Sequence, residues 1–369
     1  MCTSVMTQAT QPSGDVGVDS TGLADRIVES TTATLEMFGL YLGNRLGLYQ
    51  WLWDAGPSTV TELASGAGVD GRYAREWLEQ QAVAGFISVD RCDASPHARR
   101  YWIPEAHVGA LVHDTDPEHV APLARMVVGI ANVLDEVLAA YATGDGVPYE
   151  HYGADFRHGQ GGINRPAFEH DLASSWISAV EGAATALERG GAVADVGCGQ
   201  GYSTVAIARA WPQAEVVGVD VDRASVSDAR AFAASQDSSA RFAELGGEGL
   251  AGLGSFDVIT MLECLHDMAH PVEALRSARE ALTADGVLII ADELVADSFV
   301  APGDELERMM YGWSIVHCLP SARTEPESAG LGTVLRASTV AELVAQAGFS
   351  ACEVVDVDGG FFRIYAARP

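Results

Sequence analysis

The sequence predicts an α/β protein in which a doubly wound, mostly parallel sheet follows a mainly helical N-terminal domain. Apolar residues recur at helical spacing in residues 21–190, and from Val193 onward short apolar strands alternate with helical stretches. A glycine-rich turn, Asp195-Val196-Gly197-Cys198-Gly199-Gln200-Gly201, follows the first of these strands directly. A strand that leads through such a turn into a helix is typical of a doubly wound sheet.

The composition limits the classes of partner. The chain has 369 residues, enough for two domains, with 48% hydrophobic and 20% charged residues. The 51 acidic residues outnumber the 22 basic residues and give a formal charge of −29, which repels nucleic acid and anionic membrane surfaces. No apolar run approaches the roughly 20 residues that a membrane helix needs. We therefore expect a small-molecule partner, no nucleic acid and no membrane.

The six cysteines are scattered, without a C-x-x-C pair or a close Cys/His cluster, so no metal site is predicted. Reduced thiols of this kind fit a cytoplasmic protein. Residues 1–20 are rich in Thr, Ser, Gly and Gln and lack the basic and apolar regions of a signal peptide. We expect them to form a disordered tail.

Residues 21–105 have the pattern of a winged helix-turn-helix domain. Apolar residues from Leu23 predict an amphipathic helix that runs into Leu46–Trp53. Two short helices follow, and the second, after Val69-Asp70, should end at Gly85 with its inward residues being Tyr73, Trp77 and Leu78. A small hairpin then fits the two apolar segments Phe86–Val89 and Tyr101–Ile103.

Such a domain binds DNA in many proteins, but the charges here favour dimerisation and substrate covering. In the second short helix Arg72 and Arg75 are offset by Glu76 and Glu79, whereas a helix that enters a DNA groove normally brings net positive charge. A homodimer is predicted instead, through the apolar residues Leu35, Phe38, Tyr41, Leu42, Leu46, Leu48, Trp51 and Leu52.

Residues 106–190 are predicted to be a helical linker that covers the substrate. The clearest helical stretches are Pro122–Tyr141 and Phe168–Leu187. Between them the glycines and tyrosines of Tyr149–Gly162 predict a loop that borders a pocket.

Residues 191–369 contain the predicted sheet, with an insertion at residues 293–337. A hairpin through Asp358-Gly359-Gly360 joins the last two strands and makes the final strand antiparallel. The predicted strands are Ala192–Val196, Glu215–Asp220, Ala240–Glu244, Phe256–Leu262, Val287–Asp292, Cys352–Val357 and Phe361–Ala367.

The glycine-rich turn favours one cofactor over another. Its G-x-G-x-G spacing differs from the G-x-G-x-x-G turn of nicotinamide-binding proteins, because Tyr202 stands where the last glycine would be. Asp195, two residues before the first glycine, suits a ligand with an ammonium and a sulfonium better than a pyrophosphate. Asp220, at the end of the next strand, can accept both hydroxyls of a ribose. These features together predict S-adenosylmethionine (SAM).

The segments Val193–Gly201, Asp220, Phe256-Asp257 and the final hairpin resemble class I SAM-dependent methyltransferases. Nearly the whole chain resembles actinobacterial winged-helix methyltransferases, in the motifs Tyr41-Leu42-Gly43-Asn44-Arg45-Leu46-Gly47-Leu48-Tyr49, Arg75-Glu76-Trp77-Leu78 and Leu265-His266-Asp267-Met268. The resemblance implies a Rossmann-like sheet of seven strands with an antiparallel last strand.

The resemblance also implies roles for single residues. Gly197 and Gly199 would line the methionine part of SAM, Asp220 the ribose, and Glu244 the adenine, although aspartate is commoner at that last position. The full predicted cofactor set is Asp195, Gly197, Cys198, Gly199, Gly201, Asp220, Val221, Glu244 and Glu263. Asp195 and Glu244 can also be explained as helix-capping or solvated carboxylates.

The segment from Phe256 to Asp267 resembles small-molecule O-methyltransferases, in which a His-Asp pair ends this element and the His is the base. This implies that His266 is the base with Asp267 beside it, and an unperturbed imidazole near pH 6.5 needs no special tuning. The alternative is that His266 packs against or caps the following helix. Glu263 is a third catalytic candidate, which can contact SAM or orient an amine substrate.

The insertion holds a stripe of Met and aromatic residues, Met309–Cys318, that is expected to form part of a substrate wall. Tyr311, Trp313 and His317 are the candidate substrate residues, although core packing explains such a stripe equally well.

The sequence therefore predicts a methyltransferase that acts on a hydroxyl of an aromatic or apolar secondary metabolite. Carbon, nitrogen or sulfur acceptors stay open. A SAM-binding winged-helix transcriptional regulator and a catalytically inactive SAM-binding protein are the alternatives of a different class.

Overall fold

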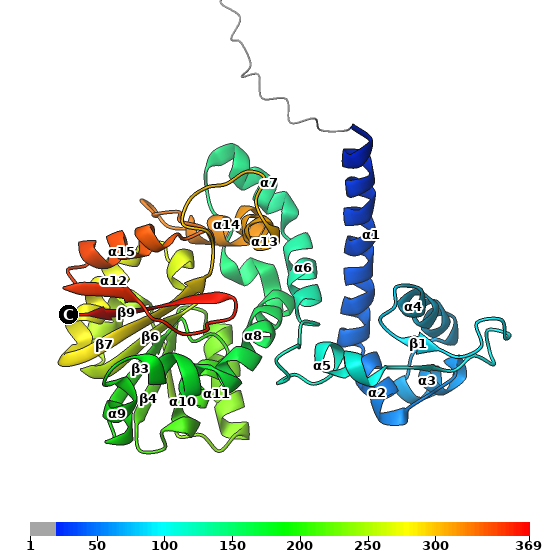
Figure 1. Cartoon of the computed structure of the whole chain (residues 1–369), viewed down its shortest axis with the longest axis horizontal. Helices are drawn as coiled ribbons and strands as arrows, with labels where there is room; N and C mark the ends of the chain where they lie inside the picture. Colours follow the sequence, from blue (N-terminus) through cyan, green and yellow to red (C-terminus); the bar gives the residue numbers. More distant parts are fainter. Residues whose placement is uncertain (1–19) are drawn as a thin grey trace, which may run out of the picture.

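The structure is a computed structural model that describes residues 20–369. The predicted tail of residues 1–20 therefore lies, except for Ser20, outside the described residues. A long N-terminal helix with a small domain at its base lies beside a larger lobe built on a central sheet (Figure 1). In residues 20–369, no helix combines the length and apolarity that a membrane span requires.

The larger lobe contains a seven-stranded sheet in the order β5-β4-β3-β6-β7-β9-β8. Strands β3 to β7 pair in parallel, and β9 is antiparallel to both β7 and β8, which confirms the predicted hairpin. The strands are β3 (Ala192–Val196), β4 (Glu215–Asp220), β5 (Arg241–Glu244), β6 (Phe256–Leu262), β7 (Leu282–Glu293), β8 (Ala351–Val354) and β9 (Phe362–Arg368).

Side-chain alternation along the strands supplies one apolar core on each face of the sheet. Ile259 and Met261 of β6 point into one core, whereas Val258 and Leu262 point into the other. The first core is covered by α12 (Pro271–Ala281), α15 (Ala337–Gln346) and the 3₁₀ segment η4 (Gly247–Gly252). The second is covered by α9 (Ala183–Glu188), α10 (Tyr202–Ala210) and the π-helix η3 (Leu172–Ile177). Helix α11 (Arg223–Ser235) connects β4 to β5.

The N-terminal domain confirms the predicted helices and hairpin with two corrections. The first helix does not run into Leu46–Trp53, because Gly47 adopts a left-handed φ of 67° and separates two helices. Tyr73 does not point inward, because the buried stripe of its helix passes through Ala74, Trp77 and Leu78 and leaves Tyr73 79% exposed. The elements are α1 (Ser20–Arg45), α2 (Leu48–Ala55), α3 (Val60–Ala67), α4 (Gly71–Val83), β1 (Ser88–Val89) and β2 (Tyr101–Trp102).

The connecting region is helical but is divided differently from the prediction. The predicted loop Tyr149–Gly162 is mostly part of a long helix, α8 (Gly153–His170). Its glycines serve close helix packing, since a Cβ at Gly159 would lie 2.9 Å from the carbonyl oxygen of Pro122. The other elements are η1 (Glu105–His107), α5 (Val108–Leu111), α6 (Leu123–Ala131), α7 (Leu134–Thr143) and η2 (Tyr149–Tyr152).

Helix α8 lies between the N-terminal helix and the sheet lobe (Figure 1) and bonds to both. Near its start, Asp155 accepts a hydrogen bond from Tyr41 at 2.8 Å and pairs with Arg45 of α1 at 3.0 Å. On the next turn, Arg157 and His158 pair with Asp228 of α11 at 3.2 and 3.0 Å. One helix thus connects the two parts of the chain.

The insertion forms a short helical layer near α6 and α7, above the sheet in the view of Figure 1. It consists of α13 (Glu305–Trp313), the π-helix η6 (Ser314–Cys318) and α14 (Leu319–Ala322).

Candidate active site

A cavity of about 650 Å³ lies at the carboxyl ends of β3, β4 and β6. Ligands of doubly wound sheets bind at this edge. The strand ends and the glycine-rich turn form one wall, and η2, α8 and the segment after α14 supply the facing residues. The predicted linker segment and the sheet domain therefore meet at one site.

The glycine-rich turn needs glycines for two different reasons. Gly197 has a left-handed φ of 69°, and a Cβ there would lie 2.6 Å from the Cβ of Cys264. A Cβ at Gly199 would meet no atom within 4 Å, so a side chain there would occupy the cavity itself. The turn is thus a cradle in which backbone groups can approach a ligand.

Asp195 supports the turn from behind and does not line the cavity. Its side chain accepts hydrogen bonds from Ser203 and Thr204 at 2.6 Å and from Thr260 at 2.7 Å. Burial raises the pKa of Asp195, although these three hydroxyl donors favour its charge. Gly201 also lies outside the cavity lining, because it packs against the ring of Phe242. Both residues shape the site without facing the ligand space.

Asp220 lines the cavity at the end of β4. Its two carboxylate oxygens accept backbone N–H bonds from Gly199 and Asp222, each at 2.8 Å. Burial raises the pKa of Asp220 to about 6, against the effect of the two amide donors. Cys198, Val221 and Glu244 of the predicted cofactor set also line the cavity.

Glu263 directly follows β6 in a strained conformation. Its φ of 54° is uncommon for a residue other than glycine, and such strain clusters at functional sites. Its amide donates to the carbonyl oxygen of Ala291 at 2.8 Å, and Asn164 of α8 donates to its carboxyl group. Burial raises the pKa of Glu263 to about 8. The carboxyl group lines the cavity next to the glycine-rich turn.

His266 lies in the 3₁₀ turn η5 (Leu265–Asp267) and is only 1% exposed. Its Nδ1 is 3.1 Å from Asp292 and 3.4 Å from Glu293, and its Nε2 is 3.5 Å from Asp267. Burial opposes the charge of the ring, but the three carboxyl groups outweigh it and raise the pKa of His266 well above its usual value. The expectation of an unperturbed imidazole is therefore wrong.

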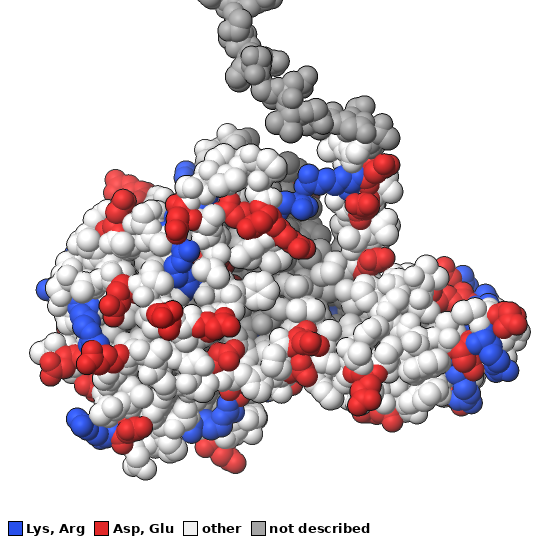
Figure 2. Space-filling model, in the orientation of Figure 1, with Lys and Arg blue, Asp and Glu red and all other residues white. Residues whose placement is uncertain are grey.

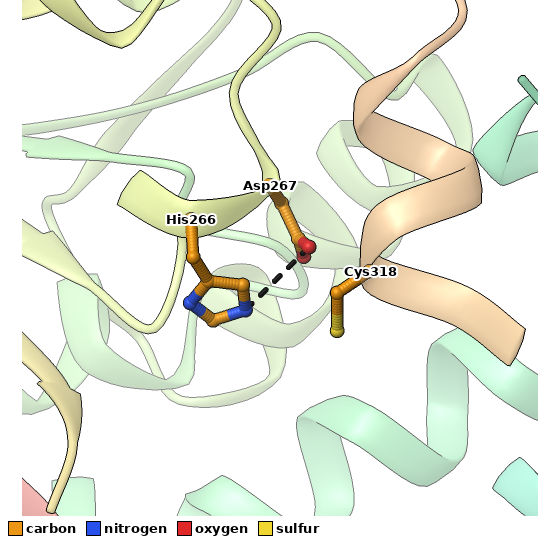
Figure 3. Close-up of side chains that lie close together, drawn as sticks. All are labelled: His266, Asp267 and Cys318. Atoms are coloured by element: carbon orange, nitrogen blue, oxygen red, sulfur yellow. Dashed lines mark ion pairs between the residues drawn. The ribbon is translucent and has the colours of Figure 1, made fainter. Parts of the chain in front are cut away.

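Asp267 is the member of the His-Asp pair that faces the cavity, while the His266 ring lies behind it. Figure 3 shows His266 and Asp267 together with the Cys318 side chain, which comes from the neighbouring helix. One donor atom from each of the three lies within 4.8 Å of the others, and His266, Asp292 and Glu293 form a second such group. Mixed donors of this kind can hold zinc, but a protonated His266 itself supplies positive charge to the carboxyl groups of Asp267, Asp292 and Glu293.

The three candidate substrate residues do not line the cavity. Tyr311 is 38% exposed, and its hydroxyl lies 3.5 Å from the guanidinium group of Arg336. Trp313 packs in the apolar cluster around Phe156. His317 is buried, and its ring centroid lies 4.0 Å from that of Phe156. Burial lowers the pKa of His317 to about 3. The insertion contributes Ser321, Thr324 and Glu325 to the cavity instead.

The predicted segment Tyr149–Gly162 does border the cavity, although mostly as part of a helix, and the residues of α8 that line it were not among the predicted site residues. They are Arg157, Gln160, Gly161 and Asn164, at the i, i+3, i+4, i+7 spacing of one helical face. That spacing was the signal, but the glycines of the segment suggested a loop. The cavity carboxyl groups are Glu150, Asp220, Asp222, Glu244, Glu248, Glu263, Asp267 and Glu325.

Comparisons with known proteins agree with this geometry. Residues 194–288 match a methyltransferase domain, and residues 21–113 match an Rv2258c-like winged HTH domain. A ubiquinone biosynthesis O-methyltransferase of Nitrosococcus oceani is 34% identical over 96 residues, which are 26% of this chain and 40% of that protein. The chain thus matches less than half the length of this relative.

Solved structures match over nearly the whole chain. A putative O-methyltransferase of Nostoc punctiforme has a TM-score of 0.69 at 16% identity. The match covers 96% of this chain and 100% of the Nostoc chain. Human N-acetylserotonin methyltransferase in complex with SAM has a TM-score of 0.69 at 16% identity. The match covers 96% of this chain and 99% of the human chain. At these identities the likeness concerns the fold. The chain therefore has an N-terminal Rv2258c-like winged helix-turn-helix domain, which is followed in the sequence by a class I SAM-dependent methyltransferase domain.

Proposed function

We propose that this protein transfers the methyl group of SAM to a hydroxyl of a small molecule that binds in the same cavity. One observation carries the proposal: the glycine cradle with Asp220 and the His266–Asp267 pair belong to the walls of a single cavity or lie directly behind them. The first suits an adenosine cofactor, and the second suits removal of a proton.

SAM, when bound, supplies an activated methyl group for in-line displacement. The chain's own residues then have two tasks, to place the acceptor oxygen and to take up its proton. We assign the proton to the His266–Asp267 pair, with Asp267 at the cavity wall and His266 behind it. Asp292 and Glu293 fix the ring of His266 from its far side.

SAM and its demethylated product S-adenosylhomocysteine (SAH) should each bind with one ligand per chain, because one cradle and one ribose carboxylate are present in the cavity. Isothermal titration calorimetry measures the stoichiometry, with NAD as the control ligand. Binding of NAD but neither SAM nor SAH at millimolar concentration would contradict the assignment. Mass analysis of the products formed from a metabolite extract and methyl-labelled SAM then tests the transfer.

We propose that α1 forms a homodimer interface. Leu35 is 62% exposed and Ile27 58% exposed, and the further exposed apolar residues of this helix are Leu23, Val28, Phe38 and Leu42. Leu48 and Leu52, which the sequence analysis placed in the interface, are buried in the domain's own core and do not belong to it.

The dimer prediction can be tested by light scattering at micromolar concentration. Ile27→Glu together with Leu35→Glu should give a monomer, since each buries a charge in the proposed contact. Leu138→Glu is the matched control, because Leu138 is 69% exposed and lies on α7 instead of α1. A parent protein that is monomeric, or a double variant that still dimerises, would refute this interface.

The regulator alternative receives no support from the arginines of the winged-helix domain. Arg75 and Arg99 both pair with Glu79, at 3.1 and 2.8 Å, and Arg72 pairs with Glu76. Carboxylates lie among the arginines at the tip of this domain (Figure 2). A surface on which each guanidinium has a carboxylate partner is poorly suited to DNA phosphates.

A further inference from the structure

Helix α8 lies directly on the glycine-rich turn. A Cβ added at Gly161 would overlap the Oε1 of Gln200, so the backbone of the helix is in contact with the turn at this point. Arg157, Gln160 and Asn164 on the same face of the helix line the cavity. A cofactor in the cradle would therefore be enclosed between the turn and α8. Movement of α8 would open that side of the cavity.

One carboxylate of α11 joins α8 to the turn from outside the cavity. The Oδ2 of Asp228 accepts hydrogen bonds from Arg157 at 3.2 Å and from the Nε2 of His158 at 3.0 Å, both on α8. It also accepts from the side-chain amide of Gln200, in the turn, at 3.5 Å. Burial opposes the charge of Asp228, but the bonds from His158 and Arg157 outweigh it and lower its pKa. The ionised carboxylate is thus the common partner of three donors.

The hydrogen bonds continue from His158 to the N-terminal helix. Arg125 of α6 lies 3.1 Å from the Nδ1 of His158 and donates to Asp155 at 2.8 Å. Asp155 also accepts from Tyr41 of α1 at 2.8 Å. Because a guanidinium only donates and an ionised carboxylate only accepts, the His158 ring accepts at Nδ1 and donates from Nε2. His158 therefore connects Arg125 to Asp228 in one defined tautomer.

These hydrogen bonds are made between protein groups alone. Asp228, His158, Arg125 and Asp155 do not line the cavity, so they are not placed to contact a cofactor. The bonds therefore hold α8 in position with the same strength whether or not the cradle is occupied. Contacts of equal strength in both cases change the rate of ligand exchange and leave the equilibrium affinity nearly unchanged.

We propose that Asp228 and His158 are positioning residues that hold α8 over the glycine-rich turn and thereby set the rate at which SAM enters and SAH leaves. Helix α8 is the gate, and it opens when the bonds of Asp228 to α8 and to the turn break. These bonds are half-buried, since the side chains of His158 and Asp228 are 35% and 36% exposed. The proposal rests on the SAM-binding function above and adds the step that controls cofactor exchange.

The test measures SAH binding to the immobilised full-length protein by surface plasmon resonance, which gives kon and koff separately. Asp228→Ala should raise both rate constants about 3- to 10-fold and keep the affinity within about twofold of the parent. His158→Ala should act in the same direction but less, because Asp228 keeps its other two donors. Both positions lie in helices, where alanine is favourable, so the variants should fold. Glu280→Ala is the control, since Glu280 is exposed on α12 and does not line the cavity.

The double variant shows whether the two residues act through one connection. Asp228→Ala already removes the bond to His158, so the double variant should exchange SAH at the rate of Asp228→Ala alone. Parent rate constants in Asp228→Ala would overturn the gate. A rise in koff without a rise in kon would overturn it too, because that is the effect of a lost binding contact. SAH would still bind in both cases, whereas a parent protein that binds no SAH would contradict the cofactor assignment as well.

Discussion

His266→Ala is expected to lower kcat by about 10²- to 10⁴-fold while SAH affinity stays nearly unchanged, which is the usual effect of losing a general base. The ring lies behind Asp267 and outside the cofactor cradle, so its removal should not disturb cofactor binding. Steady-state rates and calorimetry measure the two quantities. Because three buried carboxyl groups lose their cation, His266→Gln serves as a second variant, and His97→Ala, at an exposed position, serves as the control.

The pH dependence distinguishes a proton acceptor from a structural residue. The raised pKa of His266 means that the ring becomes neutral only toward alkaline pH, so kcat should rise with pH through that pKa and then level off. Asp292→Asn removes a negative charge 3.1 Å from Nδ1, lowers the pKa of His266 and should shift the rising limb to lower pH. A kcat within threefold of the parent for His266→Ala would assign the pair to positioning alone.

Asp220→Asn should weaken SAH binding by about 1–3 kcal/mol, which is roughly 5- to 150-fold, because charge-assisted hydrogen bonds to the ribose are lost. Calorimetry measures the change, and Asp257→Asn is the control, since Asp257 lies at the opposite end of its strand and does not line the cavity. Equal affinities for the parent and Asp220→Asn would exclude the ribose role.

The same carboxylate predicts how SAH affinity depends on pH. The pKa of Asp220 is about 6 in the ligand-free protein, so the carboxylate is ionised above this value and protonated below it. The ionised form accepts the ribose hydrogen bonds, and SAH affinity should therefore fall as the pH drops from 7 to 5. Asp220→Asn has no proton to gain and should remove this part of the pH dependence.

The sheet could be predicted closely because its signals are local. Ala192–Val196, Glu215–Asp220 and Phe256–Leu262 are strands in the structure at the predicted residues. Short, mostly apolar runs that end beside a carboxylate or a glycine specify buried parallel strands without knowledge of their neighbours. The glycine-rich turn is equally local, since its positive φ angles depend on the glycines themselves.

The sequence predicted that Tyr149–Gly162 borders a pocket, but it did not predict the helix or the residues that face the cavity. The glycines of α8 make the segment look like a loop, and only the approach of α6 explains why Gly159 is required. The pKa of His266 depends on Asp292 and Glu293, which are distant in sequence and come close only through the parallel pairing of β6 with β7. Burial and charge at a site are properties of the assembled sheet.

Helix α8 has a consequence for how such chains can be recombined. Residues 191–369 contain the entire sheet and the cofactor cradle, but Arg157, Gln160 and Asn164 of the cavity wall lie before them in the chain. A fragment that begins at the first strand of the sheet would retain the glycine-rich turn but would lack the part of the cavity wall that α8 supplies. Exchange of the N-terminal half between two relatives would therefore replace the α8 part of the cavity wall together with helix α1, while the recipient would keep its glycine-rich turn and the wall residues Ser321, Thr324 and Glu325.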